Sequence, residues 1–270
     1  MLAMLDWLVV AIYLSALVAM SLYLSRRQET AEDYFVAGNS SGPISIALSV
    51  MATQCSTNSI LGAPAFVAFV VGGGLVWLQY ELALPLAMIF IAIFIIPVFH
   101  RQRLVSVYLY LGRRFDDKTQ LLISGMFQLS RAAVAGITVY GVASMIAITT
   151  GLSFAQAVVL FGAITIIYDV LGGIRAVIFS DVVQMIILTS VLGYLAYLLI
   201  GSAGGLESML AQIPAERTAA LSFRHHGLGD GHDFAFLPML IGGFFLYVAY
   251  YGCDQSQVQR QLCAATQDDN

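Results

Sequence analysis

Polar side chains crowd the middle of one long apolar segment, between Ala52 and Ser59. Six of the seven residues from 53 to 59 carry hydroxyl or amide groups, whereas the flanking sequence is mostly apolar. Because these polar residues are consecutive, no single helical face can shield all of them from lipid. Oxygen atoms of this kind bind hard cations and polar solutes, so the stretch predicts an ion or solute site inside a membrane.

Gly62 and Pro64 follow the polar stretch and favour a break in the helix. Backbone inside a membrane can leave helical geometry only where its released N–H and C=O groups find other partners. Broken helices at mid-membrane form the ion and substrate sites of transporters. The alternative is close helix packing through Ser and Thr, which accounts for two or three such residues but not for Gln54, Asn58 and Pro64 together.

The composition is that of a membrane protein. Of the 270 residues, 59% are hydrophobic and 10% are charged, whereas soluble proteins average about 25% charged residues. The net charge of -4 is spread over loops and forms no basic face for a nucleic acid. No histidine lies inside an apolar segment to act as a base, so the sequence favours a protein that is not an enzyme.

Seven apolar segments are near or above the roughly 20 residues that a helix needs to cross a bilayer. We therefore predict an all-α polytopic membrane protein with about seven transmembrane helices in one membrane domain, residues 1–270. The segments cover residues 5–25, 44–72, 75–99, 120–150, 154–172, 177–201 and 235–263.

Basic residues favour the cytoplasmic side of a membrane, and nine of them lie at one end of the predicted helices. The opposite end carries only Arg217 and Arg224, in the long 202–234 loop. This asymmetry predicts a multi-pass protein of the plasma (inner) membrane with its N-terminus outside. The nine residues are Arg26, Arg27, Arg101, Arg103, Arg113, Arg114, Lys118, Arg175 and Arg260.

In this topology the segments 44–72 and 235–263 run in opposite directions, and polar or glycine residues interrupt both. In the later segment we predict interruptions at Gly242–Gly243 and at 252–255. Paired broken helices of opposite direction indicate an inverted-repeat transporter. Residues 5–25 would then be an extra helix, 44–201 the first five-helix repeat and 235–263 the first helix of a second repeat.

The chain closes on the polar run 267–270 without a further apolar segment. We expect it to be the N-terminal part of a longer transporter whose C-terminal half is missing, and we do not expect this fragment to transport by itself.

Four motifs, in order along the chain, resemble the sodium:solute symporter family. The resemblance covers essentially all 270 residues and implies a leucine-transporter-type inverted-repeat fold, here incomplete, with one additional N-terminal helix. The motifs are DYFVAG at 33–38, the stretch 52–64, YDVLGGIRAV at 168–177 leading into SDVVQ at 180–184, and DQSQVQR at 254–260.

The resemblance implies Na⁺ as the coupling ion, with no other cofactor or metal. It assigns Na⁺ binding to the backbone carbonyls of Ala52 and Cys55, with Ser56 beside them. The family's remaining ligands lie on a later helix that this sequence lacks, so the site is incomplete. An acidic position of some members corresponds to Gln54 here, which leaves the coupling stoichiometry open.

The resemblance to a galactose-type member assigns solute contacts to Ser59, Glu81, Tyr247 and Tyr250, of which only Glu81 and Tyr250 keep the side-chain type. A carboxylate inside a membrane is costly and indicates function. The alternative for Glu81 is a position near the outer surface, in contact with water, Tyr80 or Gln79. Tyr250 would stack on the solute as an inner gate, and its alternative is the aromatic belt at the membrane interface.

Two further charges lie within the apolar segments. The resemblance places Asp181 on the Na⁺ release path, and its alternative is a helix-start carboxylate favoured by the helix dipole. Arg131 is the only cation well inside an apolar segment, and we predict that it pairs with a carboxylate or with carbonyl groups and does not bind solute. With one acid and no cation, the predicted pocket favours a neutral, hydroxylated or amine-bearing solute.

The outer loop carries His225, His226, Asp230, His232 and Asp233, but the glycines between them define no ligand geometry, and we predict no metal site there. We therefore predict a transporter in the lipid bilayer that couples Na⁺ movement to symport of a small polar organic solute by alternating access. The alternative is a membrane sensor module of a signalling protein, which would require a kinase core after Asn270.

Overall fold

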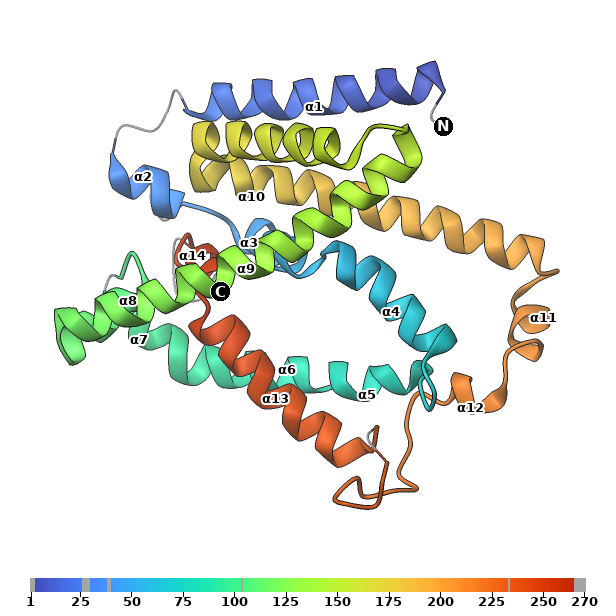
Figure 1. Ribbon diagram of the computed structural model, residues 1–270. Helices are drawn as coiled ribbons and strands as arrows, with labels where there is room; N and C mark the ends of the chain where they lie inside the picture. Colours follow the sequence, from blue (N-terminus) through green and yellow to red (C-terminus); the bar gives the residue numbers. More distant parts are fainter. Residues whose placement is uncertain (1–2, 26–29, 38–39, 103, 233, 265–270) are drawn as a thin grey trace.

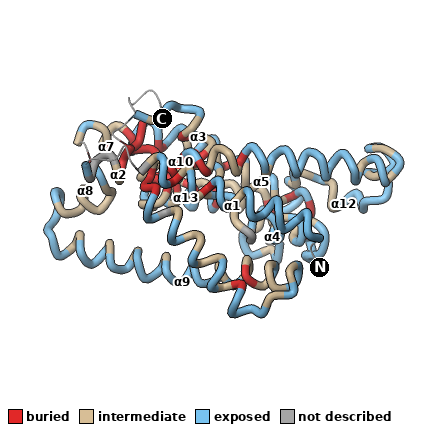
Figure 2. The backbone as a smooth tube through the Cα atoms, turned by 90° about the horizontal axis from the view of Figure 1, so that it is seen from above, coloured by how far each residue is buried: buried red, intermediate tan, exposed pale blue. Residues whose placement is uncertain are grey.

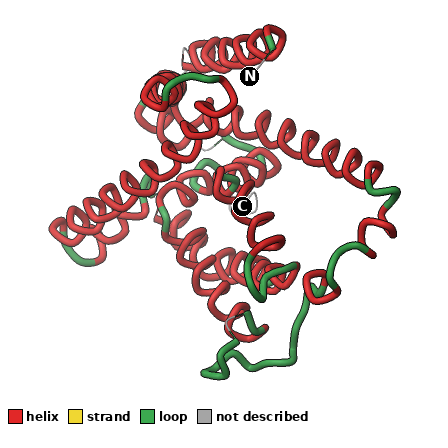
Figure 3. The backbone as a smooth tube through the Cα atoms, turned by 45° about the vertical axis from the view of Figure 1, so that its right-hand side comes forward, coloured by secondary structure: helices red, strands yellow, loops and turns green. Residues whose placement is uncertain are grey.

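The computed structural model describes residues 3–25, 30–37, 40–102, 104–232 and 234–264. Within these ranges every regular element is a helix (Figure 3), and one isolated bridge joins Ser41 to Ala264. The polar run 267–270 and several residues used above, namely Arg26, Arg27, Gly38, Arg103 and Asp233, lie outside the described residues.

Figure 1 shows the helices and their labels. The N-terminal part contains α1 (Met4–Ser25), α2 (Ala31–Val36), α3 (Pro43–Gln54) and α4 (Thr57–Phe69). The next part contains η2 (Leu75–Trp77), α5 (Leu78–Glu81), α6 (Ala83–Phe90), η3 (Ile91–Ile95), α7 (Ile96–Gln102) and α8 (Val107–Arg114). The remaining helices are α9 (Asp117–Thr150), α10 (Phe154–Ser202), α11 (Leu206–Ala211), α12 (Ala215–Thr218), α13 (Phe236–Cys253) and α14 (Gln255–Gln261).

Five described helices are long and apolar enough to cross a membrane, and the bent pair α3–α4 makes a sixth. They correspond to six of the seven predicted segments. The remaining segment contains the shorter apolar helix Phe154–Tyr168, which falls below the length that spans a bilayer alone. The five are Met4–Leu24, Leu75–Gln102, Asp117–Thr150, Val170–Ser202 and Phe236–Cys253.

The chain reverses direction inside α10, as Figure 1 shows. Gly173 has a φ of 59° and a ψ of -173° at this point, a conformation that glycine adopts without steric cost. A Cβ at the neighbouring Gly172 would lie 2.8 Å from the Oγ of Ser21, so α1 approaches α10 closely here. The double glycine therefore turns the chain and admits the first helix.

Buried residues concentrate where α3, α7, α10 and α13 converge, and α9 is exposed over most of its length (Figure 2). One cluster packs residues of α10 and α14 together, and a second joins α6, η3 and α13. The first contains Val36, Ala37, Phe99, Leu104, Ile174, Ile178, Val258, Leu262 and Cys263. The second contains Ala83, Ala87, Ile91, Ile96, Tyr247 and Tyr251.

The predicted interruption at Gly242–Gly243 is wrong, because α13 is continuous from Phe236 to Cys253. Gly243 is instead a packing position. A Cβ there would lie 2.9 Å from the Cβ of Ala83 and 3.0 Å from the carbonyl oxygen of Tyr80. The missing side chain lets α13 lie directly against α5 and α6.

Gly243→Val should destabilise the fold by roughly 1–3 kcal/mol, because the added atoms overpack a contact that includes backbone. Gly242→Val is the matched control, since a Cβ at Gly242 has no atom within 4 Å and both variants carry the same helix propensity. Thermal unfolding in detergent compares the two. Equal melting temperatures would contradict the packing role of Gly243.

Candidate ion and solute site

The first break lies between α3 and α4. Gln54 ends α3 and Thr57 begins α4, so Cys55 and Ser56 are non-helical, and the two helices are bent by 59°. The structure confirms the predicted interruption, but it precedes Pro64, which lies inside α4. The polar residues, not the proline, therefore mark the break.

Side chains of the polar stretch hold this break in shape. The Ser56 Oγ accepts a hydrogen bond from the backbone N–H of Ser59 at 3.4 Å, and the Ser59 Oγ donates to the Gln54 carbonyl at 3.0 Å. Ser59, predicted to touch solute, thus caps the end of α3. Helix caps of this kind satisfy backbone groups that the break releases.

Two carbonyls at the break have the chemistry of cation ligands. The Ala52 carbonyl accepts the Cys55 N–H at 3.1 Å, and a carbonyl oxygen retains a second lone pair. No hydrogen bond to the Cys55 carbonyl occurs among the described residues. With the Ser56 hydroxyl, these groups form a neutral oxygen set, which suits a hard monovalent cation.

The second break lies between α13 and α14, at Asp254. Its carboxylate accepts hydrogen bonds from the backbone N–H of Ser256 at 2.9 Å and from the Ser256 hydroxyl at 2.5 Å. The interruption predicted at 252–255 is confirmed. As at the first break, a polar side chain caps the helix that follows.

Arg131 on α9 forms an ion pair with Asp254, which confirms that this cation pairs with a carboxylate. Its guanidinium also lies 5.8 Å from the ring centre of Tyr250 and 5.4 Å from that of Phe127. The expectation of no cation near the predicted pocket is therefore wrong. The sequence could not reveal which side of α9 faces α13.

Glu81 and Tyr247, both predicted solute contacts, are hydrogen-bonded. The Tyr247 hydroxyl donates to the carboxylate of Glu81 at 2.7 Å, and the Trp77 Nε1–H donates to its other oxygen at 2.9 Å. Tyr247 is buried, and its ring lies 5.2 Å from that of Tyr80. The Glu81 carboxylate thus lies among aromatic side chains. Its hydrogen-bond partners are Trp77 and Tyr247, and not Tyr80 or Gln79, the partners expected for a position near the surface.

Tyr250 and Tyr251 extend this wall toward the second break. Their rings meet edge to face at 5.2 Å, and Tyr251 lies 5.9 Å from Tyr247. Val50 of α3 packs against the same cluster. The first broken helix is therefore adjacent to the seventh predicted segment.

Asp181 on α10 is part of a polar network that joins three helices. One oxygen of its carboxylate accepts hydrogen bonds from the Ser49 Oγ at 2.5 Å and from the Arg260 Nη2 at 3.1 Å. The Arg260 Nε also donates to the Ser49 Oγ at 2.8 Å. The side chains of Arg260 and Asp181 are only 11% and 14% exposed. This buried pair ties α3 and α14, which flank the two breaks, to α10.

Sequence reasoning missed Ser49 and Arg260. Arg260 closes the 254–260 motif and carries a charge typical of a cytoplasmic helix end, and neither feature names its partner. A motif that ends in arginine is nevertheless a reason to search for a carboxylate. The helix-dipole alternative for Asp181 does not describe its environment, because Arg260 pairs with the carboxylate directly.

In the loop between α12 and α13, Asp230 shapes a turn. Its carboxylate accepts hydrogen bonds from the backbone N–H groups of His226, Gly227 and His232. The Gly227 N–H is the main cause that lowers the pKa of Asp230. Within the part of the chain that the structure describes, no three His, Cys, Asp or Glu residues cluster as metal ligands.

Comparison with known proteins identifies relatives of this fold. The sequence profile of the sodium:solute symporter family matches residues 34–268. The chain is 31% identical to a putative sodium-dependent multivitamin transporter of Drosophila melanogaster, over 95% of this chain and 42% of that protein. It is also 31% identical to a sodium/sialic acid symporter of Aliivibrio fischeri, over 96% of this chain and 50% of that protein.

A solved structure of a sodium-coupled sialic acid symporter, in a substrate-bound outward-open state, superposes with a TM-score of 0.82. The two chains share 25% identity, and the match covers 99% of this chain and 55% of that one. The chain thus spans about half the length of the relatives it matches, or less. On the match of the family profile to most of its length, this chain belongs to the sodium:solute symporter family.

Proposed function

We propose that this chain is the N-terminal part of a transporter that couples inward Na⁺ movement to symport of a small polar organic solute by alternating access. The observation that carries the proposal is the proximity of two broken helices, α3–α4 and α13–α14, which the Arg260–Ser49 hydrogen bond connects at 2.8 Å. The names of the two relatives reported above, a sodium-dependent transporter and a sodium/sialic acid symporter, support it. None of them supports the signalling alternative.

In this proposal the Na⁺ ligands are the carbonyls of Ala52 and Cys55 and the hydroxyl of Ser56, completed by oxygens from the missing C-terminal half. Neutral oxygens compensate the ion without burying a second charge. Na⁺ is a transported substrate here and not a resident cofactor.

The solute would lie beside Glu81 and Tyr247, whose polar atoms can exchange their mutual 2.7 Å hydrogen bond for bonds to solute hydroxyl or amine groups. The charge of Arg131 is compensated by Asp254. Glu81 takes part in none of the described ion pairs, so it is the acid of the pocket that remains available to a solute. We therefore propose a neutral, hydroxylated or amine-bearing solute.

We further propose the organisation of the parent protein. Residues 5–25 would be an extra helix, 44–201 the first repeat, and 235–263 the first helix of the second repeat. The N-terminus would lie outside the plasma membrane. The coverage of the relatives, 42% and 50% of their lengths, supports a missing C-terminal half.

The test is uptake of a panel of labelled polar solutes by the full-length protein in proteoliposomes, with an inward Na⁺ gradient. We expect at least one solute to accumulate, and accumulation to collapse when N-methyl-D-glucamine replaces Na⁺. Equal accumulation with the organic cation would overturn the assignment of sodium coupling.

Ser56→Ala should raise the Na⁺ concentration for half-maximal uptake by about fivefold to tenfold, because it removes both a candidate ligand and a helix cap that contributes about 1 kcal/mol. Ser124→Ala is the control, since the Ser124 Oγ donates to the Leu121 carbonyl within α9, away from the break. An unchanged Na⁺ dependence in Ser56→Ala would exclude Ser56 from the ion site.

A further inference from the structure

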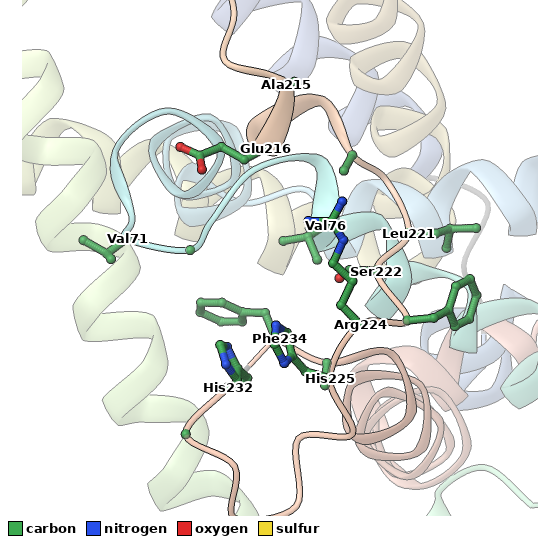
Figure 4. A pocket seen from close by; sticks show the side chains of 15 residues that line it. Val71, Val76, Ala215, Glu216, Leu221, Ser222, Arg224, His225, His232 and Phe234 are labelled. Carbon is green, nitrogen blue, oxygen red and sulfur yellow. The ribbon is translucent and has the colours of Figure 1, made fainter.

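A cavity of about 1130 Å³ lies beside the first residues of α13, at the end of this helix that is remote from α14. Its wall is built from the turn after α4, from η2, from α12 and from the loop between α12 and α13 (Figure 4). The mechanism proposed above makes no use of it. The residues that line the cavity include Val76, Glu216, Ser222, Arg224, His232 and Phe234.

The cavity walls are held by a buried amide. Gln79 of α5 is fully buried; its amide oxygen accepts the backbone N–H of Ser222 at 2.7 Å, and its Nε2 donates to the Phe234 carbonyl at 3.2 Å. Arg217 of α12 donates to the Val67 carbonyl of α4 at 2.9 Å. These hydrogen bonds attach the loop and α12 to α5 and α4, so the helices determine the shape of the cavity.

The lining combines a cation with aromatic rings. Arg224 is exposed, and within the described residues it forms no ion pair and no hydrogen bond. The rings of His225 and His232 stack with centroids 3.4 Å apart. Figure 4 shows these rings close to that of Phe234, whereas the Arg224 side chain extends from the same loop toward Val76 and Glu216 lies across the cavity.

We propose that this cavity binds an organic anion, whose carboxylate pairs with Arg224 and whose apolar part packs on Phe234 and the stacked imidazoles. Because Arg224 has no ion pair with any residue that the structure describes, its guanidinium can form a bidentate pair with the carboxylate of a ligand. The flat rings offer the apolar contact area. Among the described lining residues, Glu216 is the one carboxylate, and it forms none of the described ion pairs.

The cavity is distinct from the pocket around Glu81, but a series of aromatic contacts connects them. Phe234 meets Phe66 at 5.0 Å, and Phe66 meets Trp77 at 5.0 Å. Trp77 donates the hydrogen bond to Glu81 described above. An anion in the cavity would therefore contact Phe234, the first ring of this series, and would not touch the Glu81 carboxylate itself.

The test is binding of 4-fluorobenzoate to the full-length protein in detergent, measured by ¹⁹F NMR without Na⁺ so that the result is independent of transport. We expect saturable binding to the wild type and at least tenfold weaker binding to Arg224→Gln. Arg224→Lys should bind with intermediate affinity, since it keeps the charge but loses the bidentate geometry. Arg114→Gln, at an exposed arginine of α8, makes the same change in net charge and should bind like the wild type.

4-Fluorobenzamide, the neutral counterpart, should bind at least tenfold more weakly than the anion to the wild type. The proposal is wrong if the wild type shows no saturable binding, if Arg224→Gln binds as well as Arg114→Gln, or if the amide binds as well as the acid. None of these results would alter the proposal of sodium-coupled transport.

Discussion

Asp181→Asn should destabilise the protein by roughly 3–5 kcal/mol, because removing one member of a buried ion pair leaves the other charge uncompensated. Arg260 would then remain largely buried, 11% exposed, with Ser49 and the Ser256 carbonyl as its described partners. Thermal or urea unfolding in detergent measures the loss. Arg175→Gln is the control, since Arg175 donates only to the Ser40 hydroxyl among the described bonds.

The double variant Asp181→Asn/Arg260→Gln should be more stable than the sum of the two single changes predicts. With both charges removed, two amides can share the site without an unpaired ion. We expect an interaction free energy of about 1–3 kcal/mol between these directly contacting residues. Additive single effects would show that the pair is not energetically coupled.

The same variants should shift the sodium dependence of transport in opposite directions. If the Asp181 carboxylate receives Na⁺ on its release path, Arg260 must first leave it, because one oxygen carries bonds from both Ser49 and Arg260. Arg260→Gln should therefore lower the Na⁺ concentration for half-maximal uptake, and Asp181→Asn should raise it. A shift in the same direction for both variants would show that Asp181 does not lie on the Na⁺ release path.

Glu81→Gln should weaken solute affinity by about tenfold to a hundredfold. The carboxylate accepts hydrogen bonds from Trp77 and Tyr247 on its two oxygens, whereas glutamine offers one acceptor and turns an NH₂ group toward one of these donors. Hydrogen bonds to a charged group contribute about 1.5–3 kcal/mol, which sets the expected range. The half-saturating solute concentration of the full-length protein is the measurement.

Two variants separate a solute contact from a structural role of Glu81. Glu207→Gln changes an exposed carboxylate of α11 and should leave solute affinity unchanged. Tyr247→Phe removes one donor to Glu81 and should weaken affinity less than Glu81→Gln, because the carboxylate itself remains. An unchanged solute affinity in Glu81→Gln would show that the solute does not bind at Glu81 of α5.

The sequence by itself determined most of the membrane-spanning segments and two breaks, the ones at the polar stretch 53–59 and at 252–255. Apolar length predicts a membrane helix because the bilayer sets the required span, and consecutive polar residues such as 53–59 predict a break because lipid cannot satisfy them. The turn at Gly172–Gly173 is equally local, since it depends on the backbone freedom of Gly173. These features depend on neighbouring residues in the chain.

Tertiary structure alone decided which charges meet. Asp181 pairs with Arg260, Arg131 with Asp254, and Tyr247 donates to Glu81, 166 residues away. Such pairs depend on how each helix is rotated about its axis, and the nearly uniform apolar character of a membrane helix such as α9 conceals that rotation. At Gly243 the sequence predicts a break, but the structure shows a helix-packing position. A glycine that breaks a helix and one that admits a neighbouring helix look the same in sequence, and only the residues that pack against them distinguish the two.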